Sequence, residues 1–246
     1  FRLLHTYQEE GGPGDNFTGP IRTSLHPGVQ HFINRKAAAA MEEYRPFGAG
    51  NIAIIVADAR TGGILGYIGS QDYYDKKNAG AINYAHEPRS SGSTLKPFFY
   101  GLGLDTDVFS PASILADLPL SILNTKGEYR PGNFDHEYLG PLLYRRALAN
   151  SRTIPAIRVV DKIGIEGSYE FLKNLGLASG DKTAAYYGHG LAIGGVYITL
   201  EQLIRAYGIL ANEGRDFSLS FTPLEKYAPS SNSLISRGES TTASNR

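Results

Sequence analysis

The stretch PRSSGSTLKPF, residues 88–98, governs the interpretation of the whole chain. It places Ser93 three residues before Lys96, and residues at this spacing lie on one face of a helix. Pro97 would clash, inside a helix, with the carbonyl four residues earlier, which belongs to Ser93. We therefore expect Ser93 at the start of a helix. Apolar residues then continue at helical spacing: Leu95, Phe98, Phe99 and Leu102.

A serine and a lysine one helical turn apart can act as a nucleophile and its base. A partly desolvated lysine loses its proton near neutral pH, and it can then accept the proton of the serine hydroxyl. Free N–H groups at the helix start also favour developing negative charge. The alternative is a helix-capping Ser93 and a surface Lys96. Such a pair also occurs by chance, so the flanking sequence must decide between the two.

Composition excludes several classes of function. The 246 residues suffice for one large domain or two small ones, and 24 basic residues balance 24 acidic ones. The chain has no excess of positive charge to bind the phosphates of a nucleic acid, so no nucleic-acid partner is expected. The sequence contains no run of 18 apolar residues, so it predicts no membrane span. The absence of cysteine excludes a thiol nucleophile, and the six histidines lack metal-ligand spacing. We expect no cofactor.

The order of predicted elements is a helix, a hairpin and then several helices, which is typical of an α+β fold. A Gly- and Pro-rich segment within residues 1–20 indicates a linker. Thr199 and Gln202 form a capping box, and Gly214 is expected to end that helix. The elements expected are a helix over 27–44, a hairpin from 51–58 and 64–70, a loop over 124–139, helices near 141–149, 155–163 and 166–175, and a helix from 199.

Three segments in the same order resemble the transpeptidase domain of class A penicillin-binding proteins. They are IRTSLHPGVQ (21–30), DARTGGILGYIG (58–69) and the serine-lysine stretch at 88–98. The likeness extends over roughly residues 20 to 215. It implies the serine β-lactamase and transpeptidase fold, in which helices surround an antiparallel sheet. Residues 1–20 would then be a linker remnant, and residues 21–246 a transpeptidase domain that is incomplete at its C-terminus.

The resemblance also suggests roles for individual residues. In RALANSRTIPA (146–156), Ser151 matches a family serine that relays protons, although it could simply cap the following helix. Thr153 stands where the family has an asparagine that contacts substrate, and its single hydroxyl cannot replace an amide. In YRPGNFD (129–135), Asn133 either borders the substrate groove or belongs to a turn. The segment GHGLAIGG (188–195) resembles one that packs under the active site.

The third motif of the family, lysine-threonine-glycine on a strand, does not occur in this sequence. Lys182-Thr183-Ala184 lacks the glycine and precedes residues 188–195, whereas the family motif follows that segment. We expect residues 182–184 to be a solvated loop or a helix start. Without the motif, the site would lack a strand, a lysine that binds carboxylate and part of an oxyanion hole. The C-terminal strands of the sheet are therefore expected to be missing.

The resemblance implies a peptidoglycan D,D-transpeptidase that forms an acyl-enzyme on Ser93, with Lys96 as the base. Its partners would be peptidoglycan stem peptides and a lipid-linked precursor, and β-lactams would acylate the same serine. The resemblance also implies a membrane anchor in the parent protein and a place on the periplasmic side of the bacterial inner membrane. Two alternatives remain open: a D,D-carboxypeptidase or β-lactamase-like hydrolase, and a non-catalytic scaffold.

Overall fold

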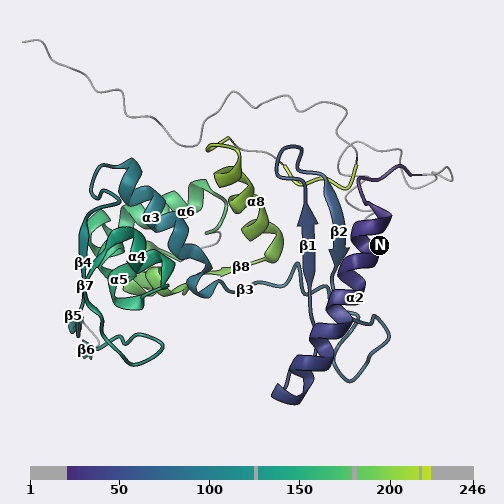
Figure 1. The fold of residues 1–246 in the computed structure, drawn as a ribbon, viewed down its shortest axis with the longest axis horizontal. Helices are drawn as coiled ribbons and strands as arrows, with labels where there is room; N and C mark the ends of the chain where they lie inside the picture. Colours follow the sequence, from purple (N-terminus) through teal and green to yellow (C-terminus); the bar gives the residue numbers. More distant parts are fainter. Residues whose placement is uncertain (1–20, 125–126, 179–181, 216–217, 223–246) are drawn as a thin grey trace, which may run out of the picture. The chain divides into compact units, whose positions relative to one another are not determined.

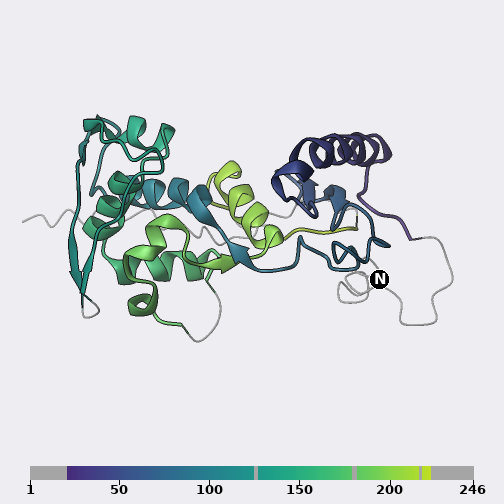
Figure 2. The same ribbon diagram turned by 90° about the horizontal axis from the view of Figure 1, so that it is seen from below.

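The computed structural model describes residues 21–124, 127–178, 182–215 and 218–222. The predicted linker, residues 1–20, lies outside the described residues. The chain divides into two compact units, which are described separately. The hairpin unit comprises residues 21–88 with 199–222, and the helical unit comprises residues 89–198. Both combine helices with antiparallel strand pairs (Figures 1 and 2), which confirms the predicted α+β class.

The hairpin unit packs one long helix against a two-stranded antiparallel sheet. Its elements are α2 (Pro27–Tyr44), the 3-10 turn η1 (Arg45–Phe47), β1 (Ile54–Ala57), β2 (Ile64–Ile68) and α8 (Leu200–Ala211). Ile54 pairs with Ile68, and Ala57 pairs with Ile64 across a bulge. Ile33 and Ala37 of α2 pack on Ile68 in a small buried cluster. The predicted first helix and hairpin are therefore confirmed.

The helical unit holds most of the helices and three short strand pairs. The helical segments are η2 (Gly92–Leu95), α3 (Lys96–Asp105), α4 (Tyr144–Ala149), α5 (Thr153–Ile163), α6 (Ile165–Asn174), α7 (Ala184–Tyr187) and η3 (Gly188–Ile193). The strands are β3 (Arg89–Ser90), β4 (Ile114–Asp117), β5 (Ile122–Asn124), β6 (Gly127–Tyr129), β7 (Gly140–Leu143) and β8 (Tyr197–Ile198). They pair antiparallel as β3–β8, β4–β7 and β5–β6. Because α3 and α5 pack together, the segments that carry Ser93 and Ser151 meet.

Two sequence predictions in the helical unit are wrong in part. The expected loop at 124–139 contains the second half of the β5–β6 hairpin. The helix expected from residue 141 begins only at Tyr144, because residues 140–143 form β7 and pair with β4. There Leu142 lies opposite Leu115, and this long-range pairing overrides the local helical pattern. The helices predicted near 155–163 and 166–175 are confirmed.

Helix α8 begins with the predicted capping box, in which Thr199 and Gln202 bond each other's backbone N–H groups. Its buried residues are Ala206, Gly208 and Ile209. On the same helix, Tyr207 and Leu210 are 38% and 39% exposed. Helix α8 contacts β1 within the hairpin unit. No helix among the described residues has the length and apolar character to cross a membrane.

Candidate active site

Ser93 lies in η2, directly before α3, as the proline argument predicts. The backbone N–H of Lys96 donates to the Ser93 carbonyl, which fixes the turn between them. The Ser93 side chain is exposed, whereas Lys96 is only 2% exposed. Leu95 and Phe98 on the following turn are fully buried and anchor the segment in the core. The fold thus presents an accessible hydroxyl above a buried amine.

The ammonium group of Lys96 points to the second motif. Its Nζ donates to the carbonyl oxygen of Ser151 at 2.5 Å and to the Ser151 Oγ at 3.3 Å. Burial lowers the pKa of Lys96 to about 8, and the nearby positive charge of Arg152 adds to the effect. A lysine with this pKa is partly neutral near physiological pH and can accept a proton. The surface-lysine alternative for Lys96 is therefore wrong.

Ser151 occupies a tight turn between α4 and α5. Its backbone φ is +50°, a left-handed conformation that is costly for a residue other than glycine. The turn is closed by two backbone hydrogen bonds, from Ser151 N to the Leu148 carbonyl and from Arg152 N to the Ala147 carbonyl. Ser151 itself is exposed. The cap for α5 comes from Asn133, so the capping alternative for Ser151 is not supported.

Arg152 anchors this turn through its whole guanidinium group. Nε donates to the Asp117 carboxylate at 2.8 Å, Nη1 to Asp135 at 2.6 Å and Nη2 to the Glu137 carbonyl at 2.6 Å. Arg152 is 6% exposed and Asp117 is fully buried. The hydrogen bond from Arg152 also lowers the pKa of Asp135. Three partners on two other segments therefore hold the residue that follows Ser151.

Asn133 lies beneath the turn, and its amide is saturated. Oδ1 accepts from the N–H groups of Thr153 (2.9 Å) and Ile154 (3.2 Å), and so caps α5. Nδ2 donates to Asp117 (2.7 Å) and to the Glu137 carbonyl (2.9 Å). An asparagine amide offers two donors and two acceptor sites, and all four are used. Asn133 is only 3% exposed and has no free group for a substrate. Of the two alternatives for Asn133, the structure therefore supports a residue of the turn and not one that borders the substrate groove.

Sequence reasoning missed Asp117 and Arg152. Arg152 stood inside the second motif but had no assigned partner, and Asp117 lies in a separate strand, β4. Thr153 is the first residue of α5, and its side chain is partly exposed. The structure therefore places Ser93 one turn before Lys96 and brings Lys96 into contact with Ser151. Thr153 follows two residues later in the chain, and Asn133 supports the turn through hydrogen bonds.

The predicted packing of residues 188–195 against the serine segment is present in the structure. Gly194 has a φ of +81°, and a Cβ at this position would collide with the backbone of Gly92. The Ser90 hydroxyl donates to the Gly194 carbonyl at 2.9 Å, and Ser91 donates to the Val196 carbonyl. This glycine-rich segment supports the turn that carries Ser93.

We expect Gly194→Ala to destabilise the helical unit by about 2 kcal/mol or more, because it combines an unfavourable φ with a backbone collision. Thermal unfolding would measure the change. Gly190→Ala is the matched control, since a Cβ there meets no atom within 4 Å and φ lies outside the left-handed range. Equal melting temperatures for the two variants would contradict the packing argument.

No strand among the described residues corresponds to the strand that carries the family's lysine-threonine-glycine motif. There β1 pairs only with β2, and one isolated parallel bridge joins Gly63, directly before β2, to Ser220. Lys182-Thr183-Ala184 is a helix start, as predicted, because the Thr183 side chain caps α7. The described part of the chain also holds no cluster of three or more His, Cys, Asp or Glu residues that could bind a metal.

Comparison with known proteins identifies the relatives of this chain. The family model for the penicillin binding protein transpeptidase domain matches residues 52–235. Penicillin-binding protein 1C of Escherichia coli is 33% identical over 210 residues, which cover 85% of this chain and 26% of that protein. Penicillin-binding protein 1A of Rickettsia bellii is 30% identical, with 72% of this chain and 22% of that protein covered. The chain thus spans about a quarter of the length of these curated relatives.

Solved structures show the same likeness. The crystal structure of penicillin-binding protein 1A from Haemophilus influenzae matches 70% of this chain with a TM-score of 0.63 and 29% identity, over 25% of that protein. The transpeptidase domain of penicillin-binding protein 3 from Burkholderia pseudomallei matches 91% of this chain and 68% of that chain, with a TM-score of 0.69 and 19% identity. The latter supports the fold alone. Together these findings confirm the predicted resemblance and fold class.

Proposed function

Because the chain belongs to the family of penicillin-binding protein transpeptidase domains, we propose that it is the acyl-transfer part of a peptidoglycan D,D-transpeptidase. Ser93 is the acylated nucleophile, Lys96 its base and Ser151 a proton relay. One observation carries the proposal. Lys96 is buried one helical turn after the exposed Ser93, and its Nζ contacts Ser151.

The proposed reaction has two steps. Ser93 Oγ attacks the carbonyl carbon of the D-Ala-D-Ala peptide bond, and its proton moves to Lys96 Nζ. The tetrahedral intermediate collapses, the C–N bond breaks, and D-alanine leaves after its amine takes a proton through Ser151. An amine of a second stem peptide then attacks the ester, restores the Ser93 hydroxyl and forms the cross-link. A β-lactam would open its ring on the same serine.

The test is labelling with a fluorescent penicillin, with intact mass and the modified peptide read in parallel. A stable adduct on the peptide that contains Ser93 supports the proposal. The experiment uses both this chain and the complete product of its gene, since the family's lysine-threonine-glycine motif is absent from this sequence. Labelling of the complete product alone would mean that a further segment completes the site. No labelling of either would overturn the catalytic role.

A non-catalytic scaffold is the second candidate, favoured by Thr153 in place of the family's asparagine and by the missing motif. Absence of penicillin labelling in both this chain and the complete gene product would support the scaffold. If labelling occurs, product analysis with a D-Ala-D-Ala peptide separates cross-linking from hydrolysis. Dimeric product would support transpeptidation, whereas the peptide shortened by one D-alanine, formed when water attacks the ester, would support the carboxypeptidase alternative. Membrane anchoring and a periplasmic site stay proposals that rest on the relatives.

We expect the rate of acylation to rise with pH and to level off above about 8, the pKa of Lys96. Only the neutral amine accepts the Ser93 proton, so below this pKa the rate should fall about tenfold for each pH unit. Stopped-flow or gel-based acylation rates between pH 6 and 9 would measure this dependence. A rate that is flat across this range would contradict the role of Lys96 as the base.

A further inference from the structure

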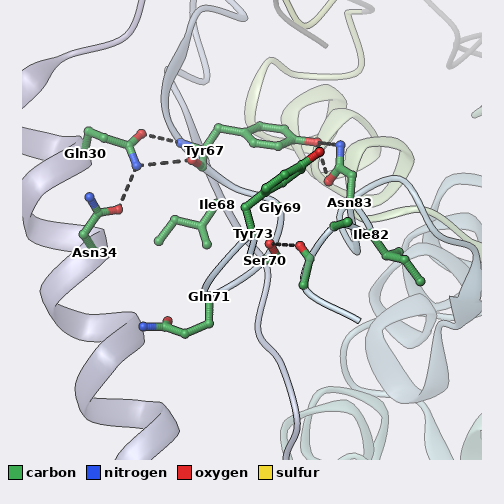
Figure 3. Close-up of a pocket in the computed structure, with 12 residues that line it drawn as sticks. Gln30, Asn34, Tyr67, Ile68, Gly69, Ser70, Gln71, Tyr73, Ile82 and Asn83 are labelled. Atoms are coloured by element: carbon green, nitrogen blue, oxygen red, sulfur yellow. Dashed lines mark hydrogen bonds between the residues drawn. The ribbon is translucent and has the colours of Figure 1, made fainter. Parts of the chain in front are cut away.

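The hairpin unit contains a cavity of about 600 Å³ that the proposed chemistry does not use. It lies between α2, the end of β2 and the chain that follows as far as Asn83 (Figure 3). The volume is within the range of small-molecule sites in proteins, which measure roughly 300–1,000 Å³. All of its lining residues belong to the hairpin unit, so the cavity is defined within one compact part of the chain.

The lining mixes polar and apolar residues and carries no charged side chain. One residue in five of the whole chain is charged, so a wholly neutral wall is a distinctive feature. The wall consists of amides, hydroxyls, tyrosine rings, small residues and the isoleucines Ile68 and Ile82. Such a surface can exchange hydrogen bonds with neutral polar groups, but it offers no counter-ion. A ligand with a buried carboxylate or ammonium would lose hydration here without compensation.

Part of the wall is held rigid by internal hydrogen bonds. The Gln30 side chain bonds both the N–H (2.9 Å) and the carbonyl (3.2 Å) of Tyr67. The Tyr67 hydroxyl accepts from Asn83 Nδ2 at 2.9 Å and donates to the Glu201 carboxylate at 2.8 Å. A Cβ at Gly69 would lie 2.5 Å from Asn83 Oδ1, so a larger residue there would displace the Asn83 side chain. These contacts fix the shape of the cavity before any ligand arrives, which reduces the entropy cost of binding.

Three other lining residues keep binding capacity. The side-chain amide of Gln71 forms no hydrogen bond with any described residue, and the Asn34 amide accepts one bond but donates none. The Tyr73 ring is 60% exposed, and Figure 3 shows it inside the group of lining side chains. A free donor and acceptor beside an exposed aromatic ring can bind a molecule that has amides or hydroxyls along one edge and a C–H face.

We propose that this cavity binds neutral N-acetylated sugar units, the chemistry of a glycan strand. Sugar hydroxyls and acetamido groups match the Asn34 and Gln71 amides, and a pyranose ring presents C–H bonds to Tyr73. A stem peptide fits less well, because its terminal carboxylate would meet no positive charge. The assignment of the ligand to peptidoglycan rests on the proposed function, whereas the recognition chemistry rests on the cavity itself.

The experiment titrates this chain with chitotetraose, a neutral chain of N-acetylglucosamine, and follows backbone and side-chain amide signals by NMR. We expect saturable shifts at Asn34 and Gln71. Tyr73→Ala should weaken binding at least about tenfold, as expected for loss of a stacking aromatic. Tyr44→Ala is the matched control: this tyrosine at the end of α2 is 52% exposed and does not line the cavity, so binding should stay within about twofold.

Three results would overturn the proposal: absence of saturable shifts, equal weakening by both tyrosine variants, or displacement of the sugar by a D-Ala-D-Ala peptide at the same residues. The last would assign the cavity to peptide instead. Penicillin labelling is read separately on the same samples. Sugar binding with no labelling of either this chain or the complete gene product would sink the proposed acyl transfer and keep the glycan site, and labelling without sugar binding would do the reverse.

Discussion

Ser93→Ala is expected to abolish covalent labelling by penicillin in whichever form of the protein labels, the chain itself or the complete gene product. The acyl-enzyme requires the Ser93 oxygen, so the loss should exceed about 1,000-fold in rate, which is the complete loss of signal in a gel assay. Ser93 is exposed, and its hydroxyl forms no hydrogen bond with another described residue. The substitution should therefore leave the melting temperature nearly unchanged.

The neighbouring hydroxyls cannot replace Ser93, because each is engaged in the support of the turn. Ser90 Oγ donates to the Gly194 carbonyl, and Ser91 Oγ donates to that of Val196. Thr94 Oγ1 donates to the Ser91 carbonyl at 2.6 Å. Ser110→Ala, an exposed serine beyond the end of α3, is the matched control and should label normally. Labelling that persists in Ser93→Ala would place the nucleophile elsewhere and overturn the proposed mechanism.

The sequence was sufficient for the residues whose roles depend on local spacing. Ser93 and Lys96 are one turn apart on the same segment, so helical geometry alone predicts their relation. The position of Ser151 follows from a motif between two helices. The capping box at Thr199 and the hairpin after α2 also depend on short-range patterns, and the structure confirms them.

The features that sequence reasoning missed depend on long-range contacts. Asp117 and Arg152 are distant in the chain and meet only because β4 packs beside the start of α5. The β5–β6 hairpin is short and exposed, so it lacks the alternation that marks a half-buried strand.

Asp117→Ala is expected to have the largest effect on stability among the site variants. It removes a fully buried carboxylate and leaves Arg152, which is 6% exposed, without its inner partner. Breaking a buried ion pair in this way costs about 3–5 kcal/mol. The Asn133 amide and the Leu139 N–H also lose an acceptor. Urea denaturation followed by circular dichroism would measure the change in the free energy of unfolding.

The same variant should slow acylation even where the protein stays folded, because the Arg152 network holds Ser151 in its left-handed conformation against Lys96. At low temperature, with the folded state confirmed by circular dichroism, the acylation rate should fall at least about tenfold. Glu128→Ala is the matched control, since its ion pair with Arg130 lies on the surface and should affect neither stability nor rate. If Asp117→Ala lowers stability but its folded fraction acylates at the original rate, the network stabilises the fold without positioning Ser151, and its proposed part in catalysis is wrong.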